Sequence, residues 1–306
     1  MMLKKYGLKL EEEQSKLILN SKEKAMKILV TGINGQLGTE LSHLLDDQQI
    51  EYTGVGSKEL DITDTKTVNN YFLKNRPEVV YHCAAYTAVD AAEEEPGKST
   101  NERVNVLGTQ NVARASESVG ATLVYISTDY VFDGTNDQMY TEETPTAPKN
   151  EYGRSKLAGE EAVAKIMSKY YIIRTSWVFG EYGKNFVYTM LNLAKTHDHL
   201  TVVSDQYGRP TWTRTLAEFM TYAIKTDVPF GLYQLSNDGS CTWYEFASEI
   251  LKNKPVEISP VTSEEYPQKA YRPRHSIMDL NKVKATGFKI PTWQDTLHEF
   301  MAKIEV

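Results

Sequence analysis

Residues 26–38 read MKILVTGINGQLG: a short apolar run, three spaced glycines and the start of a helical pattern. This order predicts a strand, a tight turn and the beginning of a helix. Gly32 lets the chain turn, Gly35 lets the backbone approach a pyrophosphate, and Gly38 lets the helix pack against the strand. The N–H groups and positive dipole end of that helix would then face the anion. The stretch is interpreted as a dinucleotide phosphate site; an ordinary βα turn is the alternative.

The composition is that of a globular protein with one or two domains. The chain has 306 residues, of which 41% are hydrophobic and 25% charged, and both fractions are ordinary for a folded protein. Its net charge of −7 argues against nucleic acid as a partner and favours a cytoplasmic protein. An anionic cofactor would then be held by local backbone dipoles and a few basic side chains. No apolar run approaches the roughly 18 residues needed to cross a bilayer, so no membrane partner is expected.

The two cysteines and the N-terminal 25 residues are not expected to take part in binding or catalysis. The two cysteines, Cys83 and Cys241, have no CxxC spacing, which predicts neither a disulfide framework nor a zinc site. Residues 1–25 are charged, with scattered leucines, and they lack the apolar region of a secretory signal. We expect them to form a loosely attached N-terminal extension, with a short amphipathic helix as the alternative.

From residue 26 onward, apolar runs alternate with helical patterns. The expected strands are Lys27–Val30, Ile50–Val55, Glu78–His82, Thr122–Ile126, Tyr171–Thr175 and Gly231–Leu235, and Leu200–Val203 is also strand-like. The expected helices are Leu37–Asp46, Thr65–Asn75, Asn101–Val119, Tyr152–Ser168, Asn185–Lys195, Thr213–Lys225, Thr242–Lys252 and a last one from Thr292. This alternation predicts an α/β fold of the Rossmann type, a doubly wound parallel sheet that binds its ligands at the carboxyl ends of the strands.

The regular alternation weakens after residue 176, which predicts two parts. We assign residues 26–176 to an NAD(P)-binding Rossmann domain and residues 177–306 to a smaller, α-rich substrate part. We expect this second part to be partly interleaved with the sheet. Residues 266–274 contain two prolines, Pro267 and Pro273, in an irregular pattern and predict a loop.

The residues after the second and third strands bear on the cofactor. An NAD-specific site usually has an acid at the end of the second strand, to hold the ribose 2′-OH. Ser57 and Lys58 stand there instead, which favours NADP(H) or the use of both cofactors. Asp61 follows and is interpreted as a neighbour of the adenine. After the third strand, the small side chains of Ala84 and Ala85 leave room for the cofactor ribose.

The residues after the fourth strand predict the reactive centre. The hydroxyls and carboxylate of Ser127–Asp129 could hold a substrate oxygen, and Asn150 can cap the following helix. On that helix Tyr152 and Lys156 are one turn apart, so they share a face. A nearby ammonium would lower the tyrosine pKa from about 10, and Tyr152 could then pass a proton to a carbonyl oxygen that Thr128 or Ser127 stabilises by a hydrogen bond. A surface Tyr–Lys pair is the structural alternative.

Three motifs in this order resemble the extended short-chain dehydrogenase/reductase family: the glycine spacing, the Ser/Thr pair before Asp129, and Tyr152-x-x-x-Lys156. Within it, the chain is similar to the dTDP-4-dehydrorhamnose reductase family in the segments HCAAYTAVDAAEEEP, YISTDYVFDG, EYGRSKLAGE, IIRTSWVFG and SDQYGRPTW. The similarity runs from Met26 to near the C-terminus. It implies that NADPH or NADH reduces the 4-keto group of a dTDP-sugar, dTDP-4-dehydro-β-L-rhamnose, in dTDP-rhamnose biosynthesis.

The resemblance also implies roles for individual residues. By position, Thr128, Tyr152 and Lys156 would be catalytic, and Tyr152 and Lys156 would also meet the cofactor. The other cofactor contacts implied are Gly32, Asn34, Gly35, Gln36, Leu37, Gly38, Asp61, Ile62, Ala84, Ala85 and Tyr86.

A second set of residues would bind the substrate. The resemblance implies that Thr128, Asp129 and Tyr130 hold the sugar and that Trp177 stacks on it. Independently of the resemblance, Arg272 and Arg274, which stand beside Pro273 in the expected loop, are candidates for the nucleotide diphosphate; exposed surface charge is the alternative, more so for Arg274 than for Arg272. A guanidinium matches the geometry of phosphate oxygens.

The metal expectation comes from a departure from the family. In some members, acidic side chains of two subunits share a magnesium ion. Glu40 fits one ligand position, but the others hold Thr215 and Lys303, and a charged lysine cannot ligate a divalent cation. We therefore expect no metal, no magnesium-bridged dimer, and either a monomer or a weak homodimer.

Two alternative functions stay open at this point. One is another nucleotide-sugar reductase, epimerase or dehydratase; a dehydratase would favour a carboxylate pair after Thr128, whereas Asp129 is followed by Tyr130. The other is a non-catalytic regulatory subunit, since a fold does not fix a function. Loss of the Tyr152–Lys156 pair would favour that second alternative, and the pair is intact.

Overall fold

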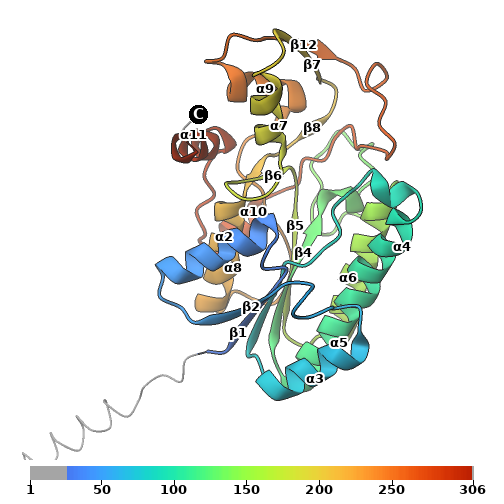
Figure 1. The fold of residues 1–306 in the computed structure, drawn as a ribbon, viewed down its shortest axis with the longest axis vertical. Helices are drawn as coiled ribbons and strands as arrows, with labels where there is room; N and C mark the ends of the chain where they lie inside the picture. The colour runs from blue at the N-terminus through green and yellow to red at the C-terminus, as the bar shows by residue number, and fades with distance from the viewer. Residues whose placement is uncertain (1–25, 305–306) are drawn as a thin grey trace, which may run out of the picture.

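A single six-stranded sheet organises the molecule (Figure 1). The computed structural model describes residues 26–304. The strand order is β10-β5-β4-β3-β1-β2, and every neighbouring pair is parallel. The strands are β1 (Ile28–Thr31), β2 (Tyr52–Val55), β3 (Val79–His82), β4 (Thr122–Thr128), β5 (Tyr170–Thr175) and β10 (Gly231–Gln234). The strands expected from the sequence are confirmed, and the central strands β1 and β3 are buried along their whole length because helices cover both faces of the sheet.

Helices cover the two faces of the sheet in separate layers (Figure 1). One layer contains α2 (Gln36–Asp47), α8 (Thr213–Lys225) and α10 (Asn281–Ala285), which share one apolar core with the sheet. The opposite layer contains α3 (Thr65–Asn75), α5 (Thr109–Val119) and α6 (Glu151–Ile166), which share a second core. The doubly wound architecture predicted from the sequence is therefore confirmed.

One expected helix, over residues 101–119, has a more complex course. It begins earlier, as α4 (Gly97–Glu102), passes through a π-helical stretch, η2 (Arg103–Gly108), and continues as α5. Within the π-helical stretch Asn105 is buried. Wider π turns are often found at functional sites, and this one faces the loop that follows β3, through Asn105 and Tyr86.

The remaining elements form an upper part with its own apolar core. Its helices are α7 (Phe186–Leu193), α9 (Trp243–Leu251) and α11 (Trp293–Lys303), and its longer strands are the parallel pair β7 (His199–Val203) and β12 (Glu257–Val261). Short strands and 3₁₀ turns complete the chain: β6 (Val178–Phe179), β8 (Tyr207–Gly208), β9 (Thr211–Trp212), β11 (Cys241–Thr242), η1 (Ala91–Glu93) and η3 (Asp129–Val131). The division of the chain into two parts after residue 176 stays a prediction. Beyond that point β10 is still a strand of the sheet, and α8 still packs against the sheet.

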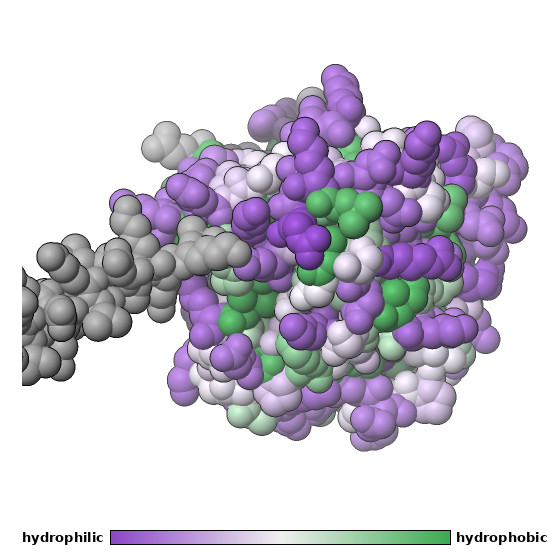
Figure 2. Space-filling view, turned by 90° about the horizontal axis from the view of Figure 1, so that it is seen from below, coloured by the Kyte–Doolittle hydropathy of each residue, from purple (hydrophilic) through white to green (hydrophobic). Residues whose placement is uncertain are grey.

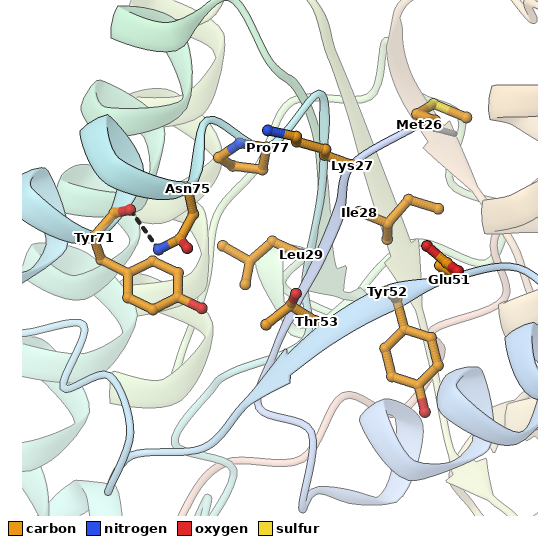
Figure 3. Close-up of a pocket in the computed structure, with 10 residues that line it drawn as sticks. All are labelled: Met26, Lys27, Ile28, Leu29, Glu51, Tyr52, Thr53, Tyr71, Asn75 and Pro77. Atoms are coloured by element: carbon orange, nitrogen blue, oxygen red, sulfur yellow. Dashed lines mark hydrogen bonds between the residues drawn. The ribbon is translucent and has the colours of Figure 1, made fainter. Parts of the chain in front are cut away.

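A pocket of about 320 Å³ lies at the N-terminal ends of β1 and β2 (Figure 3). It is lined by residues 26–29 and 51–53, and Tyr71 and Asn75 reach it from α3. Seen from below, the molecule is mainly hydrophilic, with small, separate apolar patches (Figure 2). Parallel sheets bind ligands at the opposite, carboxyl ends of their strands, so this pocket is not the candidate site.

Three expectations concern the chain as a whole. The expected N-terminal extension, residues 1–25, lies outside the described residues. Within residues 26–304, no helix has the length and apolar character needed to span a membrane. Cys83 and Cys241 are both free thiols, as their spacing predicts.

Candidate active site

The glycine-rich turn has the shape that a dinucleotide phosphate requires. Gly32 has a φ of +69°, and a Cβ there would lie 2.5 Å from the backbone nitrogen of Ala84. A Cβ at Gly38 would collide with the carbonyl oxygen of Gly32. Gly35 occupies the N-cap of α2 and no side chain caps that helix, so its first N–H groups are available to an anion. The turn therefore fits a bound pyrophosphate.

The side chain of Gln36 in this turn is already hydrogen-bonded. Gln36 donates from Nε2 to the carbonyl oxygen of Val178 (3.4 Å) and accepts at Oε1 from Asn185 Nδ2 (2.9 Å). Asn34 lies against the end of β2, where a Cβ on Gly56 would be 2.5 Å from its Nδ2. Gln36 thus joins the turn to the upper part of the molecule, and the backbone N–H is its free group for a pyrophosphate. Leu37 follows it on α2 and packs against the first core.

An acid does lie at the end of β2, which corrects the expectation from the sequence. Glu59 accepts a hydrogen bond at Oε2 from the backbone N–H of Gly56 (2.9 Å), because the chain turns back with Leu60 N–H donating to the Gly56 carbonyl (2.9 Å). The spacing G-x-x-E over residues 56–59 was the available signal. Asp61, further on, binds the backbone and hydroxyl of the residue two positions later, and Ile62 is buried.

The small residues after β3 lie beside the glycine turn. Ala84 is in contact range of Gly32, and Ala85 and Tyr86 follow it. Asn105 holds Tyr86 on both sides: its Oδ1 accepts from the Tyr86 N–H (2.9 Å), and its Nδ2 donates to the Tyr86 carbonyl (3.0 Å). Sequence reasoning missed Asn105, since a single asparagine inside a helical pattern carries no distinguishing signal.

The structure brings Thr128 and Tyr152 together and places Lys156 one turn behind them. Thr128 is the last residue of β4, and its hydroxyl donates to Asp129 (3.1 Å) while lying close enough to Tyr152 to lower the pKa of that phenol. Asn150 caps α6 by accepting from the Gly153 N–H (2.6 Å), as the sequence predicted. Lys156 is 2% exposed, with its Nζ 4.1 Å from the centre of the Tyr125 ring.

The electrostatics of the pair differ from expectation. Burial raises the pKa of Tyr152 well above its ordinary value, and Asp129 and Tyr130 act in the same direction, while the nearby Thr128 hydroxyl opposes them. Burial also lowers the pKa of Lys156 to about 7. The predicted lowering of the tyrosine pKa is therefore wrong: Lys156 is buried and Tyr152 is half-buried, and the sequence does not reveal the burial of either group. Tyr152 keeps its proton at neutral pH, which suits a proton donor.

The substrate-side residues gather next to this pair. Asp129 is 2% exposed, burial raises its pKa to about 6, and its Oδ1 accepts from the Thr128 hydroxyl (3.1 Å). The Tyr130 ring meets the Tyr152 ring edge-on, with centroids 6.0 Å apart. The guanidinium of Arg272 lies over the same Tyr130 ring, with its Cζ 5.8 Å from the ring centre. Substrate contact by these residues stays a prediction that this arrangement favours.

Trp177 has a backbone conformation that is rare for a large side chain. Its φ is +47°, and such strain is often found at functional sites. Its indole ring stacks on Trp243, with centroids 3.7 Å apart and planes at 12°. A Cβ on Gly208 would lie 2.5 Å from the indole ring. Since Trp243 covers one face, the predicted stacking on the sugar is restricted to the other face or the edge.

The residues considered for magnesium are paired with other groups. Glu40 is buried and its carboxylate meets Arg214 (3.4 Å), while Lys303 pairs with Glu181 (3.7 Å). The hydroxyl of Thr215 accepts from a side-chain amide (3.1 Å). Within residues 26–304, no three His, Cys, Asp or Glu side chains are arranged to hold a metal ion. The absence of a magnesium-bridged dimer stays a prediction.

A glycine-rich turn at the start of α2 and a Tyr-x-x-x-Lys helix on a doubly wound parallel sheet define the class as a short-chain dehydrogenase/reductase. The family model described as "RmlD substrate binding domain" matches residues 26–306. The chain belongs to this RmlD family, whose members include the dTDP-4-dehydrorhamnose reductases.

Individual relatives agree over most of their length. The chain is 42% identical to the spore coat polysaccharide biosynthesis protein SpsK of Bacillus subtilis, covering 90% of this chain and 96% of that protein. It is 41% identical to a dTDP-4-dehydrorhamnose reductase of Streptomyces griseus, covering 89% and 91%. The solved dTDP-4-dehydrorhamnose reductase of Bacillus anthracis, in complex with NADP, is 42% identical, with a TM-score of 0.87 over 91% of this chain and 99% of that one.

Proposed function

We propose that this chain reduces the 4-keto group of dTDP-4-dehydro-β-L-rhamnose to give dTDP-β-L-rhamnose, with NADPH or NADH as the reductant. The observation that carries the proposal is the position of Tyr152, in the first turn of α6, beside Thr128–Tyr130 at the carboxyl end of β4. The names of the relatives support the substrate, and the NADP complex of one of them supports the cofactor. A relative named for spore coat polysaccharide synthesis supports a role in supplying activated sugars.

The side chains of the site divide the reaction between them. The nicotinamide cofactor, when bound, supplies the hydride that adds to C4 of the sugar. Tyr152 donates its phenolic proton to O4, which becomes the hydroxyl of the product, and Thr128 stabilises the charge that develops on that oxygen. Lys156, one turn behind on α6, stabilises the phenolate that remains on Tyr152.

The glycine-rich turn and the loop after β3 position the cofactor. The first N–H groups of α2 bind its pyrophosphate, because no side chain caps that helix at Gly35. Asn105 fixes the backbone of Tyr86 and also donates to Ser155 (3.1 Å) on the catalytic helix. The cofactor loop and the helix of Tyr152 are thereby held in one geometry.

The test of this proposal is the variant Tyr152→Phe. We expect the reduction of dTDP-4-dehydro-β-L-rhamnose, followed at the nicotinamide absorbance, to fall by about 100-fold or more, because the proton donor is lost. Binding of NADPH should be unchanged. Tyr71→Phe removes a hydroxyl at the opposite end of the sheet and should retain full activity.

Two outcomes would contradict the proposal. Full activity of Tyr152→Phe would show that this phenol is not the proton donor. Failure of the native chain to oxidise NADPH or NADH with this substrate, while it reduces a 4-keto sugar carried by UDP or GDP, would contradict the nucleotide. A panel of these nucleotide sugars, assayed with each cofactor, separates the two results.

A further inference from the structure

An irregular segment, residues 266–274, is tied to the active site; we call it the strap. Asp90, in the loop after β3, accepts from the strap at both carboxylate oxygens: from the Ala270 N–H (3.0 Å) and from Arg272 Nη2 (2.7 Å). Asn150, the cap of α6, donates from Nδ2 to the Tyr271 carbonyl (2.9 Å). The strap is thus fastened both to the cofactor side of the site and to the helix of Tyr152.

These contacts hold the Arg272 guanidinium in one orientation. Its side chain is 14% exposed and Asp90 takes one of its terminal nitrogens. The other, Nη1, is buried without a hydrogen-bond partner among the described residues. The guanidinium lies over the Tyr130 ring, which in turn meets the Tyr152 ring. A fixed cation with a spare donor therefore lies one aromatic ring away from the proton donor.

The spare donor indicates an anionic acceptor. A buried N–H without a partner costs free energy, whereas a guanidinium can bind a carboxylate with one edge and phosphate oxygens with another. The other cations of the strap are less suited: Lys269 pairs with Glu94, and the side chain of Arg274 is 68% exposed. Arg272 is the enclosed cation of the strap, and a sugar nucleotide carries its diphosphate next to the sugar.

We propose that Asp90 is a positioning residue that presents Arg272 to the diphosphate of the sugar nucleotide. Asp90 itself does not touch the substrate; it fixes the guanidinium so that Nη1 points to the bound phosphate. This role rests on the proposed function and deepens it, since it assigns the recognition of the diphosphate to a pair of residues 182 positions apart.

The experiment measures binding of dTDP by isothermal titration calorimetry to the full chain. Asp90→Asn keeps an oxygen for the Ala270 N–H but loses the ionic bond to Arg272, so we expect the Kd for dTDP to rise about tenfold. Arg272→Ala should raise it at least as much. Adding Asp90→Asn to Arg272→Ala should cause no further rise, because Asp90 acts through Arg272. Binding of NADPH should be unchanged in all three variants.

A kinetic readout separates positioning from a structural role. In Asp90→Asn the KM for the sugar nucleotide should rise about tenfold, while kcat stays within about twofold of the native value. The matched control is Glu94→Gln, which removes the contact of Lys269 on the same strap and should leave the Kd for dTDP unchanged.

Three outcomes would overturn the inference. If Asp90→Asn bound dTDP with the native Kd, Asp90 would have no role in binding. If Asp90→Asn raised the Kd as much in the Arg272→Ala background as in the native chain, Asp90 would not act through Arg272. An equal loss in Glu94→Gln would mean that general disturbance of the strap is responsible. If the native chain fails to bind dTDP, the proposed substrate is wrong as well, so the two failures can be told apart.

Discussion

At the scale of single residues, Glu59 is the side chain that bears on the choice between the two cofactors. Its carboxylate is held at the end of β2 by the Gly56 N–H, where an acid favours the free 2′-OH of NADH and repels the 2′-phosphate of NADPH. We expect Glu59→Gln to raise the ratio of kcat/KM for NADPH over NADH about fivefold, since the repulsion is removed. Steady-state kinetics with both cofactors measure this ratio.

The matched control for that change is Glu51→Gln. Glu51 is exposed at the other end of β2, so its neutralisation changes the net charge equally but should leave the cofactor ratio unchanged. An equal shift in both variants would mean that the overall charge, not the position of Glu59, governs the preference.

The roles of residues whose partners are close in the sequence could be predicted. The roles of residues whose partners are distant in the sequence could not. The cap Asn150 and the face shared by Tyr152 and Lys156 depend on neighbours within one helical turn. Asp90, by contrast, meets Arg272 across 182 positions. The pKa of Tyr152 was predicted in the wrong direction because burial is a property of the folded chain.

At the scale of elements, a helix or strand could be predicted where its sequence has a strong hydrophobic pattern. The sheet strands have apolar runs and the long helices have apolar faces, and these pack in the hydrophobic cores. β12 pairs with β7 alone and has no fully buried residue, so its sequence EISPV lacks such a pattern. α10 is only five residues long. The π-helical stretch η2 has a helical composition, and its wider turn depends on the loop that Asn105 contacts.

The start of α6 allows a prediction at this scale. Asn150 satisfies the Gly153 N–H and also holds the Tyr271 carbonyl. We expect Asn150→Ala to lower the free energy of unfolding by about 1–2 kcal/mol through loss of the cap. It should also lower kcat about tenfold, because the first turn of α6 carries Tyr152 and small displacements of catalytic groups are costly. Urea unfolding and steady-state kinetics measure the two effects.

A second cap serves as the control. Asp64 caps α3 by accepting from the Lys66 and Thr67 N–H groups, away from the site. Asp64→Ala should cost about the same stability and leave kcat unchanged. If both variants lost activity equally, the effect of Asn150 would be one of general stability and not of the placement of Tyr152.

At the scale of the whole molecule, we expect chelation to leave the oligomeric state unchanged. The carboxylates of Glu40 and Glu181 already pair with Arg214 and Lys303, and these cations oppose the binding of a divalent ion. Sedimentation velocity should give one and the same monomer or weak homodimer with EDTA and with excess magnesium. A dimer that EDTA converts to monomer would contradict this expectation.

The return of α8 and β10 to the sheet has a consequence for how such an enzyme can change its substrate. β10 forms the outer strand beside β5, and α8 covers one face, yet both follow the first segment of the upper part in the chain. Exchange of that part between homologues by a single crossover would replace pieces of the sheet as well. New specificity in this architecture therefore has to come from substitutions, or from insertions with two junctions, that leave the shared scaffold intact.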